Sequence, residues 1–109
     1  MSEIIRASTP THEFVVGFNP ANVDIIRVSY AQNGFLLFIK EKDDFTVTAG
    51  YGEYTLSTTL TQRETLRFNP AYPVDIQMRA VTSEGGSSFS EKWTLSVEDV
   101  IDTEVINEA

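Results

Sequence analysis

The chain has 109 residues, of which 41% are hydrophobic and 22% are charged, a composition typical of one globular domain. Sixteen acidic residues against eight basic ones give a net charge of -8, which argues against a surface that binds nucleic acid. The absence of cysteine excludes disulfides, thiolate catalysis and cysteine-ligated metal sites. A single histidine likewise excludes a histidine-rich metal site.

The sequence carries no targeting or membrane signal that we can identify. It does not begin with a basic segment followed by a long apolar one, so we expect no signal peptide. The longest apolar run, residues 35–39, has five residues, whereas a membrane-spanning helix needs about 20. We therefore expect a protein that folds in a cytoplasm and has neither a membrane nor a nucleic acid as a partner.

Apolar residues alternate with polar ones along most of the chain, which predicts strands with one buried face. The run at residues 35–39 does not alternate, and it predicts a strand that is buried on both faces or covered by a neighbour. Asn33-Gly34 predicts a tight hairpin before that strand, because both residues tolerate positive φ. The expected strands lie within residues 14–18, 26–30, 35–39, 45–49, 54–60, 74–80 and 89–97.

Seven short strands separated by turns predict an all-β fold, a single β-sandwich of the immunoglobulin or fibronectin-III type in residues 1–97. A small barrel is the alternative. We expect Trp93 to lie in the core and Tyr51, within the turn Gly50-Tyr51-Gly52, to be exposed. Residues 83–88 predict a loose hairpin loop.

One short segment departs from the strand pattern. Thr61 and Glu64 have the spacing of a capping box, which predicts a short helical turn near residues 62–67. Leu60, Leu66 and Phe68 are expected to pin this turn over the open end of the core.

A short sequence occurs twice, 50 residues apart: Phe18-Asn19-Pro20-Ala21 and Phe68-Asn69-Pro70-Ala71. Asn before Pro starts a turn, and each copy leads into an expected strand. We hypothesise that both turns and the acidic C-terminal segment share one end of the sandwich. The alternative is that two independent turns have converged on the same favourable local sequence.

Residues 98–109 form an acidic C-terminal arm or short helix. They hold five of the sixteen acids and no base, which leaves eleven acids and eight bases, or -3, on the remainder. The interleaved apolar residues have helical spacing, but they are β-branched, so an extended arm is the alternative. We expect this segment and Tyr51 to bind a partner. The predicted partner-binding residues are Glu98, Asp99, Val100, Ile101, Asp102, Glu104, Val105, Ile106 and Tyr51.

The side chains that carry chemistry form no catalytic motif. His12 stands alone at a strand entrance, where a structural or solvated histidine is a better interpretation than a general base. Asp43-Asp44 favours a solvated turn over a calcium site, because the alternating spacing of a calcium loop is missing. We therefore expect no enzyme activity, no cofactor and no metal.

Several segments carry a resemblance to a known family. They are residues 9–14, 28–34, 60–68, 74–79 and 102–106, and the most specific stretches are Tyr30-Ala31-Gln32-Asn33-Gly34 and Leu60-Thr61-Gln62-Arg63-Glu64-Thr65. The chain resembles small all-β proteins encoded by tailed bacteriophages and prophages of gut bacteria. The resemblance implies a virion or phage-encoded context and supplies no catalytic residues. We expect a protein of the virion that is made in the host cytoplasm.

The favoured interpretation is a non-enzymatic structural or interaction protein of a phage particle, in multiple copies on a capsid, connector or tail. Its partners would be other phage structural proteins or itself, reached through sheet edges and the C-terminal segment. One alternative is a small carbohydrate- or receptor-binding module that uses Tyr51, Tyr54 or Tyr72. Another is an inhibitor of a host protein, whose acidic surface occupies a basic site.

Overall fold

The computed structural model describes residues 3–82 and 88–106, and within them the chain is mostly β, with one short α-helix. Within the described residues, eight strands form two sheets, one more strand than the sequence predicts, because the three-residue strand β1 pairs in parallel with β8. The expected hairpin loop at residues 83–88 lies, up to residue 87, outside the described residues. The elements are β1 (Glu3–Ile5), β2 (Thr11–Val16), η1 (Pro20–Asn22), β3 (Ile25–Gln32), β4 (Phe35–Glu41), η2 (Lys42–Asp44), β5 (Thr46–Ala49), β6 (Tyr54–Thr59), α1 (Gln62–Leu66), β7 (Val74–Val81) and β8 (Ser88–Glu98).

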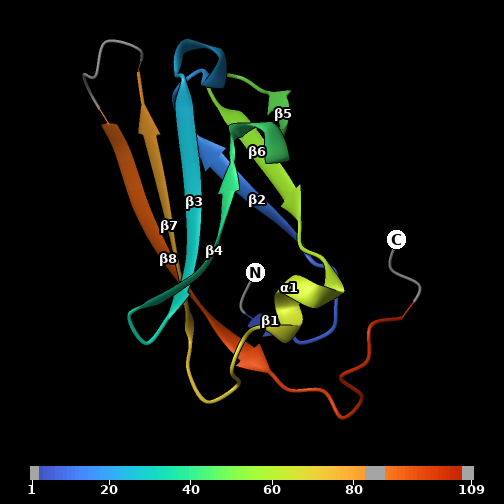
Figure 1. Ribbon diagram of the computed structural model, residues 1–109. Coiled ribbons are helices and arrows are strands. Elements are labelled where there is room, and N and C mark those ends of the chain that lie inside the picture. The colour runs from blue at the N-terminus through green and yellow to red at the C-terminus, as the bar shows by residue number, and fades with distance from the viewer. Residues whose placement is uncertain (1–2, 83–87, 107–109) are drawn as a thin grey trace.

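The two sheets face each other as in a sandwich (Figure 1). One has five strands in the order β1-β8-β7-β3-β4, and the other has three in the order β2-β6-β5. Apart from β1 with β8, the neighbouring strands are antiparallel. No helix in the described part of the chain is long and apolar enough to cross a membrane.

The core lies between the sheets and is built from the alternate residues that the sequence pattern predicts. Phe14 of β2 contacts Trp93 of β8 across the sandwich, with ring centroids 4.9 Å apart. Trp93 itself is half-buried at the margin of the core. The buried apolar residues of the strands are Ile4, Phe14, Val16, Ile26, Val28, Tyr30, Leu56, Val74, Ile76, Met78, Ala80 and Leu95.

The hairpin between β3 and β4 has the predicted turn. Asn33 and Gly34 both adopt left-handed backbone, with φ of 49° and 82°. These two positive values match the type I′ turn, whose twist suits a two-residue hairpin.

Strand β4 corrects one prediction. Its apolar run is not buried on both faces, since within the described residues β4 pairs only with β3 and forms an edge of the five-stranded sheet. Leu37 and Phe38 pack against the core. Phe35 is 71% exposed and Leu36 is 58% exposed. The pairing register shifts between Tyr30 and Ala31, which marks a β-bulge in this hairpin. An apolar run therefore lies at an open edge.

Helix α1 confirms the predicted capping box. The Thr61 hydroxyl accepts from the Glu64 amide at 3.1 Å, and the Glu64 carboxylate accepts from the Thr61 amide at 2.9 Å. Leu60 and Phe68, on either side of the helix, are fully buried, whereas Leu66 is only partly buried. These contacts hold α1 over one end of the sandwich (Figure 1).

The two Asn-Pro-Ala turns are alike locally but lie at opposite ends of the sandwich. The side chains of Asn19 and Asn69 each accept a hydrogen bond from the amide two residues later, at 3.0 and 2.9 Å. One turn precedes β3 and the other precedes β7, and these strands are antiparallel neighbours. The hypothesis of a shared end is therefore wrong. The C-terminal segment follows β8 at the end that holds Asn69 and α1.

Candidate interaction surfaces

The C-terminal segment returns to its own domain instead of extending into solvent. The Arg6 guanidinium contacts the Asp99 carboxylate at 2.6 Å, just after β8 ends. Further along, the Gln62 side chain donates to the carbonyl of Ile106 at 2.5 Å and accepts from its amide at 2.8 Å. The segment is thus fastened to the α1 end at two points (Figure 1).

Residues 99–106 form an irregular arm, so the helical alternative is not the one the structure adopts. Asp99 accepts a hydrogen bond from the Val100 amide at 2.7 Å, and Asp102 accepts one from the Glu104 amide at 3.0 Å. Such local side-chain bonds to the backbone compete with helical hydrogen bonds. The hydrogen bonds from Arg6 and from the Val100 amide hold the pKa of Asp99 below its usual value.

The predicted partner-binding residues of this arm divide by exposure. Ile101 is completely exposed and Ile106 is 57% exposed, whereas Val100 and Val105 are partly buried. The acids of the described arm are exposed, and among them Asp99 alone forms an ion pair within residues 3–82 and 88–106. These acids are Glu98, Asp99, Asp102 and Glu104.

Tyr51 is fully exposed, as predicted, but it does not join the C-terminal arm. It lies in the turn between β5 and β6, and β6 then runs to the opposite end of the sandwich, where α1 begins. Tyr54 is half-buried against the core, and Tyr72 precedes β7 at the α1 end. The three tyrosines of the carbohydrate-binding interpretation therefore form no common face.

Helix α1 is tied to elements from distant parts of the chain, a feature that sequence spacing alone does not reveal. Lys40 of β4 pairs with Glu64 at 2.7 Å, and both side chains are largely buried. Arg6 donates to the carbonyl of Leu66 at 3.0 Å, and the Thr65 hydroxyl donates to that of Ser8 at 2.8 Å. The helix is therefore a fixed support for the arm that crosses it.

His12 is a buried structural residue, one of the two non-catalytic roles expected for it. Its side chain is inaccessible to solvent and stacks on Tyr30 with ring centroids 5.7 Å apart. Burial lowers the pKa of His12 to about 4, so the imidazole is neutral near pH 7. Its Nε2 atom has no hydrogen-bond partner among the described residues.

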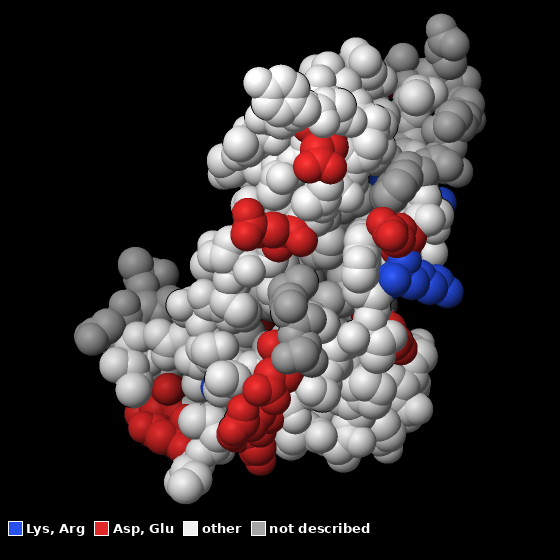
Figure 2. Space-filling view, turned by 180° about the vertical axis from the view of Figure 1, so that it is seen from behind, with Lys and Arg blue, Asp and Glu red and all other residues white. Residues whose placement is uncertain are grey.

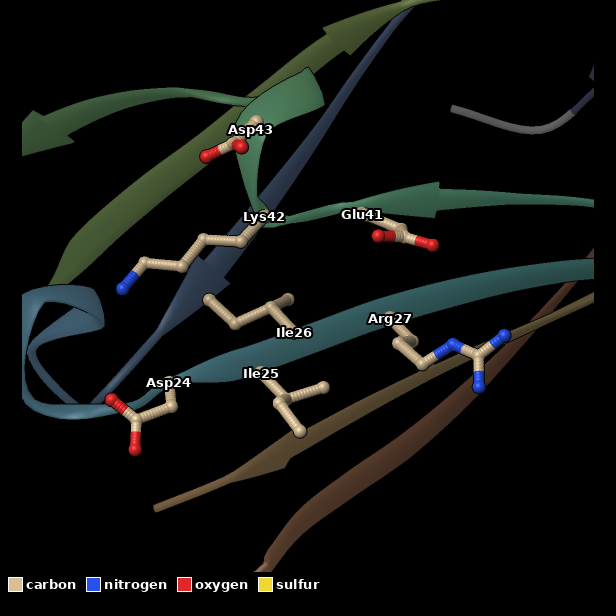
Figure 3. Close-up of a pocket in the computed structure, with 7 residues that line it drawn as sticks. All are labelled: Asp24, Ile25, Ile26, Arg27, Glu41, Lys42 and Asp43. Atoms are coloured by element: carbon tan, nitrogen blue, oxygen red, sulfur yellow. The ribbon is translucent and has the colours of Figure 1, made fainter. Parts of the chain in front are cut away.

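A charged hollow of about 450 Å³ opens between the start of β3 and η2. Figure 3 shows Lys42 and Arg27 reaching in opposite directions, so their charges do not converge on one point. The Lys42 ammonium instead donates to the carbonyl of Val23 at 2.6 Å. Asp43 and Asp44 lie in an exposed 3-10 turn, which agrees with the solvated turn predicted for them.

Carboxylate groups outnumber basic groups on the face of the molecule that Figure 2 shows. In the view of Figure 2, red carboxylate groups are spread over several elements, and blue is confined to small areas. No group of three or more metal-ligating side chains occurs within the described residues.

Strand β4 carries apolar side chains that the core covers only in part: Leu37 and Phe38 pack against the core, whereas Phe35 and Leu36 are exposed. Ala31 of β3 is paired with Leu36, and Ser29 with Ile39, so Leu36 and Ile39 lie on the outer sheet face beside small residues. The described part of the chain adds no strand to this sheet beyond β4, which leaves backbone groups along that side without a sheet partner.

Comparison with known proteins returns no relative: no protein-family model matches the chain, and no curated protein or solved structure is significantly similar to it.

Proposed function

We propose that this chain is a non-enzymatic structural or interaction protein that assembles in multiple copies by adding a strand of a neighbouring copy at the β4 edge. The observation that carries the proposal is the open edge itself, where Phe35 is 71% exposed and Leu36 is 58% exposed. Edge pairing supplies backbone hydrogen bonds, and the exposed apolar side chains add burial and selectivity. A long apolar edge is otherwise an aggregation hazard that proteins usually protect.

The setting we propose is a tailed-phage particle, as a capsid decoration, connector or tail-associated protein made in the host cytoplasm. The resemblance of residues 28–34 and 60–68 to small phage-encoded β proteins supports this setting. The buried, neutral His12 supports a role without acid-base catalysis.

We also propose that the fold is an immunoglobulin-like sandwich. The strand orders β2-β6-β5 and β8-β7-β3-β4 resemble the two sheets of that fold, and this resemblance supports the proposed fold type.

The proposal is tested by measuring molar mass with light scattering over a range of protein concentrations. Leu36→Lys should reduce self-association at least tenfold, because it places a charge on the open edge. Val15→Lys is the matched control, since Val15 is 55% exposed on an edge strand of the other sheet. Equal self-association of the two variants, or a monomeric wild-type chain at every concentration, would overturn the proposed function.

A further inference from the structure

Three basic side chains lie next to one another on the outer face of the five-stranded sheet. Arg27 of β3 and Arg79 of β7 are direct cross-strand partners, and both are exposed. Lys92 of β8 is also exposed. It lies on the same face, because it follows by two residues Ser90, the cross-strand partner of Arg79. We call Arg27, Arg79 and Lys92 the cationic face.

The cationic face is unbalanced within its own chain. Like charges directly opposite each other destabilise a sheet. Glu41 is the cross-strand neighbour of Arg27 on its other side, yet no ion pair joins them in the described part of the chain. The side chains of Arg27, Arg79 and Lys92 form no hydrogen bond or ion pair with any described residue. The other five cations of the chain, Arg6, Lys40, Lys42, Arg63 and Arg67, each have a partner.

The C-terminal arm carries the complementary charge. Glu98, Asp102 and Glu104 are exposed and form no ion pair among the described residues. The arm does not reach the cationic face of its own chain, because its bonds to Arg6 and Gln62 hold it at the α1 end. Figure 1 shows it running beneath α1, away from β7.

A shallow hollow adjoins the cationic face and offers a place for an apolar side chain. It measures about 380 Å³ and is lined by the small side chains of Ser29 and Ala31 and by Asp75, Gln77, Lys92 and Thr94, so one carboxylate lies beside the Lys92 ammonium. Ile101 of the arm is completely exposed in its own chain, so it is free to be buried elsewhere. Burying such a side chain favours association, because apolar surface is removed from water.

We propose that the cationic face binds the C-terminal arm, residues 98–106, of a second copy of this chain. The arm's carboxylates face Arg27, Arg79 and Lys92, and Ile101 enters the hollow beside Ser29. This inference rests on the proposed self-assembly and names a second contact for it, separate from the β4 edge. Reciprocal binding of two arms forms a closed pair, and one-way binding extends a chain of copies.

A charge-swap experiment tests the proposal. The face variant is Arg27→Glu with Arg79→Glu, and the arm variant is Asp102→Lys with Glu104→Lys. Sedimentation of each variant alone should show self-association at least tenfold weaker than wild type, and a one-to-one mixture should restore it. Added salt should weaken the wild-type contact, because exposed charge pairs are screened.

The control is Thr46→Glu with Thr48→Glu, which adds two acids on β5, away from the cationic face. This variant should associate like the wild type. Circular dichroism establishes that each variant is folded. As a second measurement, a peptide of residues 98–106 added to the isotope-labelled full chain should shift amide resonances of β3, β7 and β8, and a scrambled peptide should not.

The outcomes separate this inference from the proposed function. Charge variants that associate like the wild type, while Leu36→Lys does not, overturn the cationic-face contact and leave the β4 edge standing. A mixture that fails to restore association also overturns the contact. A wild-type chain that stays monomeric and binds no peptide overturns both.

Discussion

The Nδ1 atom of His12 lies 2.7 Å from the hydroxyl oxygen of Tyr30, and this hydrogen bond joins the two sheets inside the sandwich. Burial disfavours the charged form of each group, so it lowers the pKa of His12 and, together with the negative charge of Glu64, raises that of Tyr30. Both side chains are therefore neutral near pH 7. The polar contact between the sheets persists because neither group has to be desolvated as an ion.

Acid should weaken the fold through His12. Its pKa is about 4 in the folded chain and about 6.5 when unfolded, so the unfolded chain binds more protons between these values. The contribution of neutral His12 is complete above pH 6.5 and is lost progressively as the pH falls toward 4. The free energy of unfolding in urea should be about 2 kcal/mol lower at pH 4.5 than at pH 7 from this group alone. His12→Gln should flatten this part of the pH profile, and an unchanged slope in that variant would refute the assignment.

Gly34→Ala should destabilise the β3–β4 hairpin by about 1 kcal/mol, because φ at this position is positive and alanine is strained there. Gly17 offers a matched control. A Cβ added at either glycine meets nothing within 4 Å, but Gly17 lacks the positive φ, so Gly17→Ala should change the stability little. Urea titrations of both variants check this, and equal effects would contradict the turn geometry.

Loss of the helix cap of α1 should lower the stability of the fold. Thr61→Ala removes the hydroxyl that accepts from the Glu64 amide, and such changes lower stability by about 1 kcal/mol. Thr46→Ala, at an exposed strand position, is the comparison. Thermal unfolding of the two variants measures the difference, and a Thr61→Ala variant no less stable than the comparison would count against the capping role.

The seating of the arm on α1 predicts a local effect on hydrogen exchange. Gln62→Ala removes the acceptor of the Ile106 amide, so that amide should exchange faster in the variant. Amides within β7 should keep their rates, because the core is unchanged. Equal exchange at Ile106 in wild type and variant would show that the side chain of Gln62 does not hold the arm.

Much of the fold follows from local sequence. The alternation in residues 74–80 and 26–30 correctly predicts which side chains of β7 and β3 are buried, and Thr61 with Glu64 predicts the helix cap. These features depend on interactions within a few residues. The local sequence is therefore enough to predict the buried strand faces and the helix cap.

Long-range placement does not follow in the same way. The apolar sequence of residues 35–39 would suit a central strand as well as an edge strand. The strand order of the sheet, which depends on distant segments, places β4 at the edge. The two Asn-Pro-Ala turns lie apart because β3 and β7 are antiparallel, and the pairing of Arg27 with Arg79 needs the register of those strands. The three-residue strand β1 is too short to show a period.

The most direct test of assembly through the β4 edge is amide hydrogen exchange at increasing protein concentration. Pairing with a neighbouring copy should slow exchange within residues 35–41, while residues 46–49 of the exposed edge strand β5 keep their rates. If the chain self-associates, as light scattering would show, and exchange in β4 stays the same at every concentration, the β4 edge is not the assembly surface.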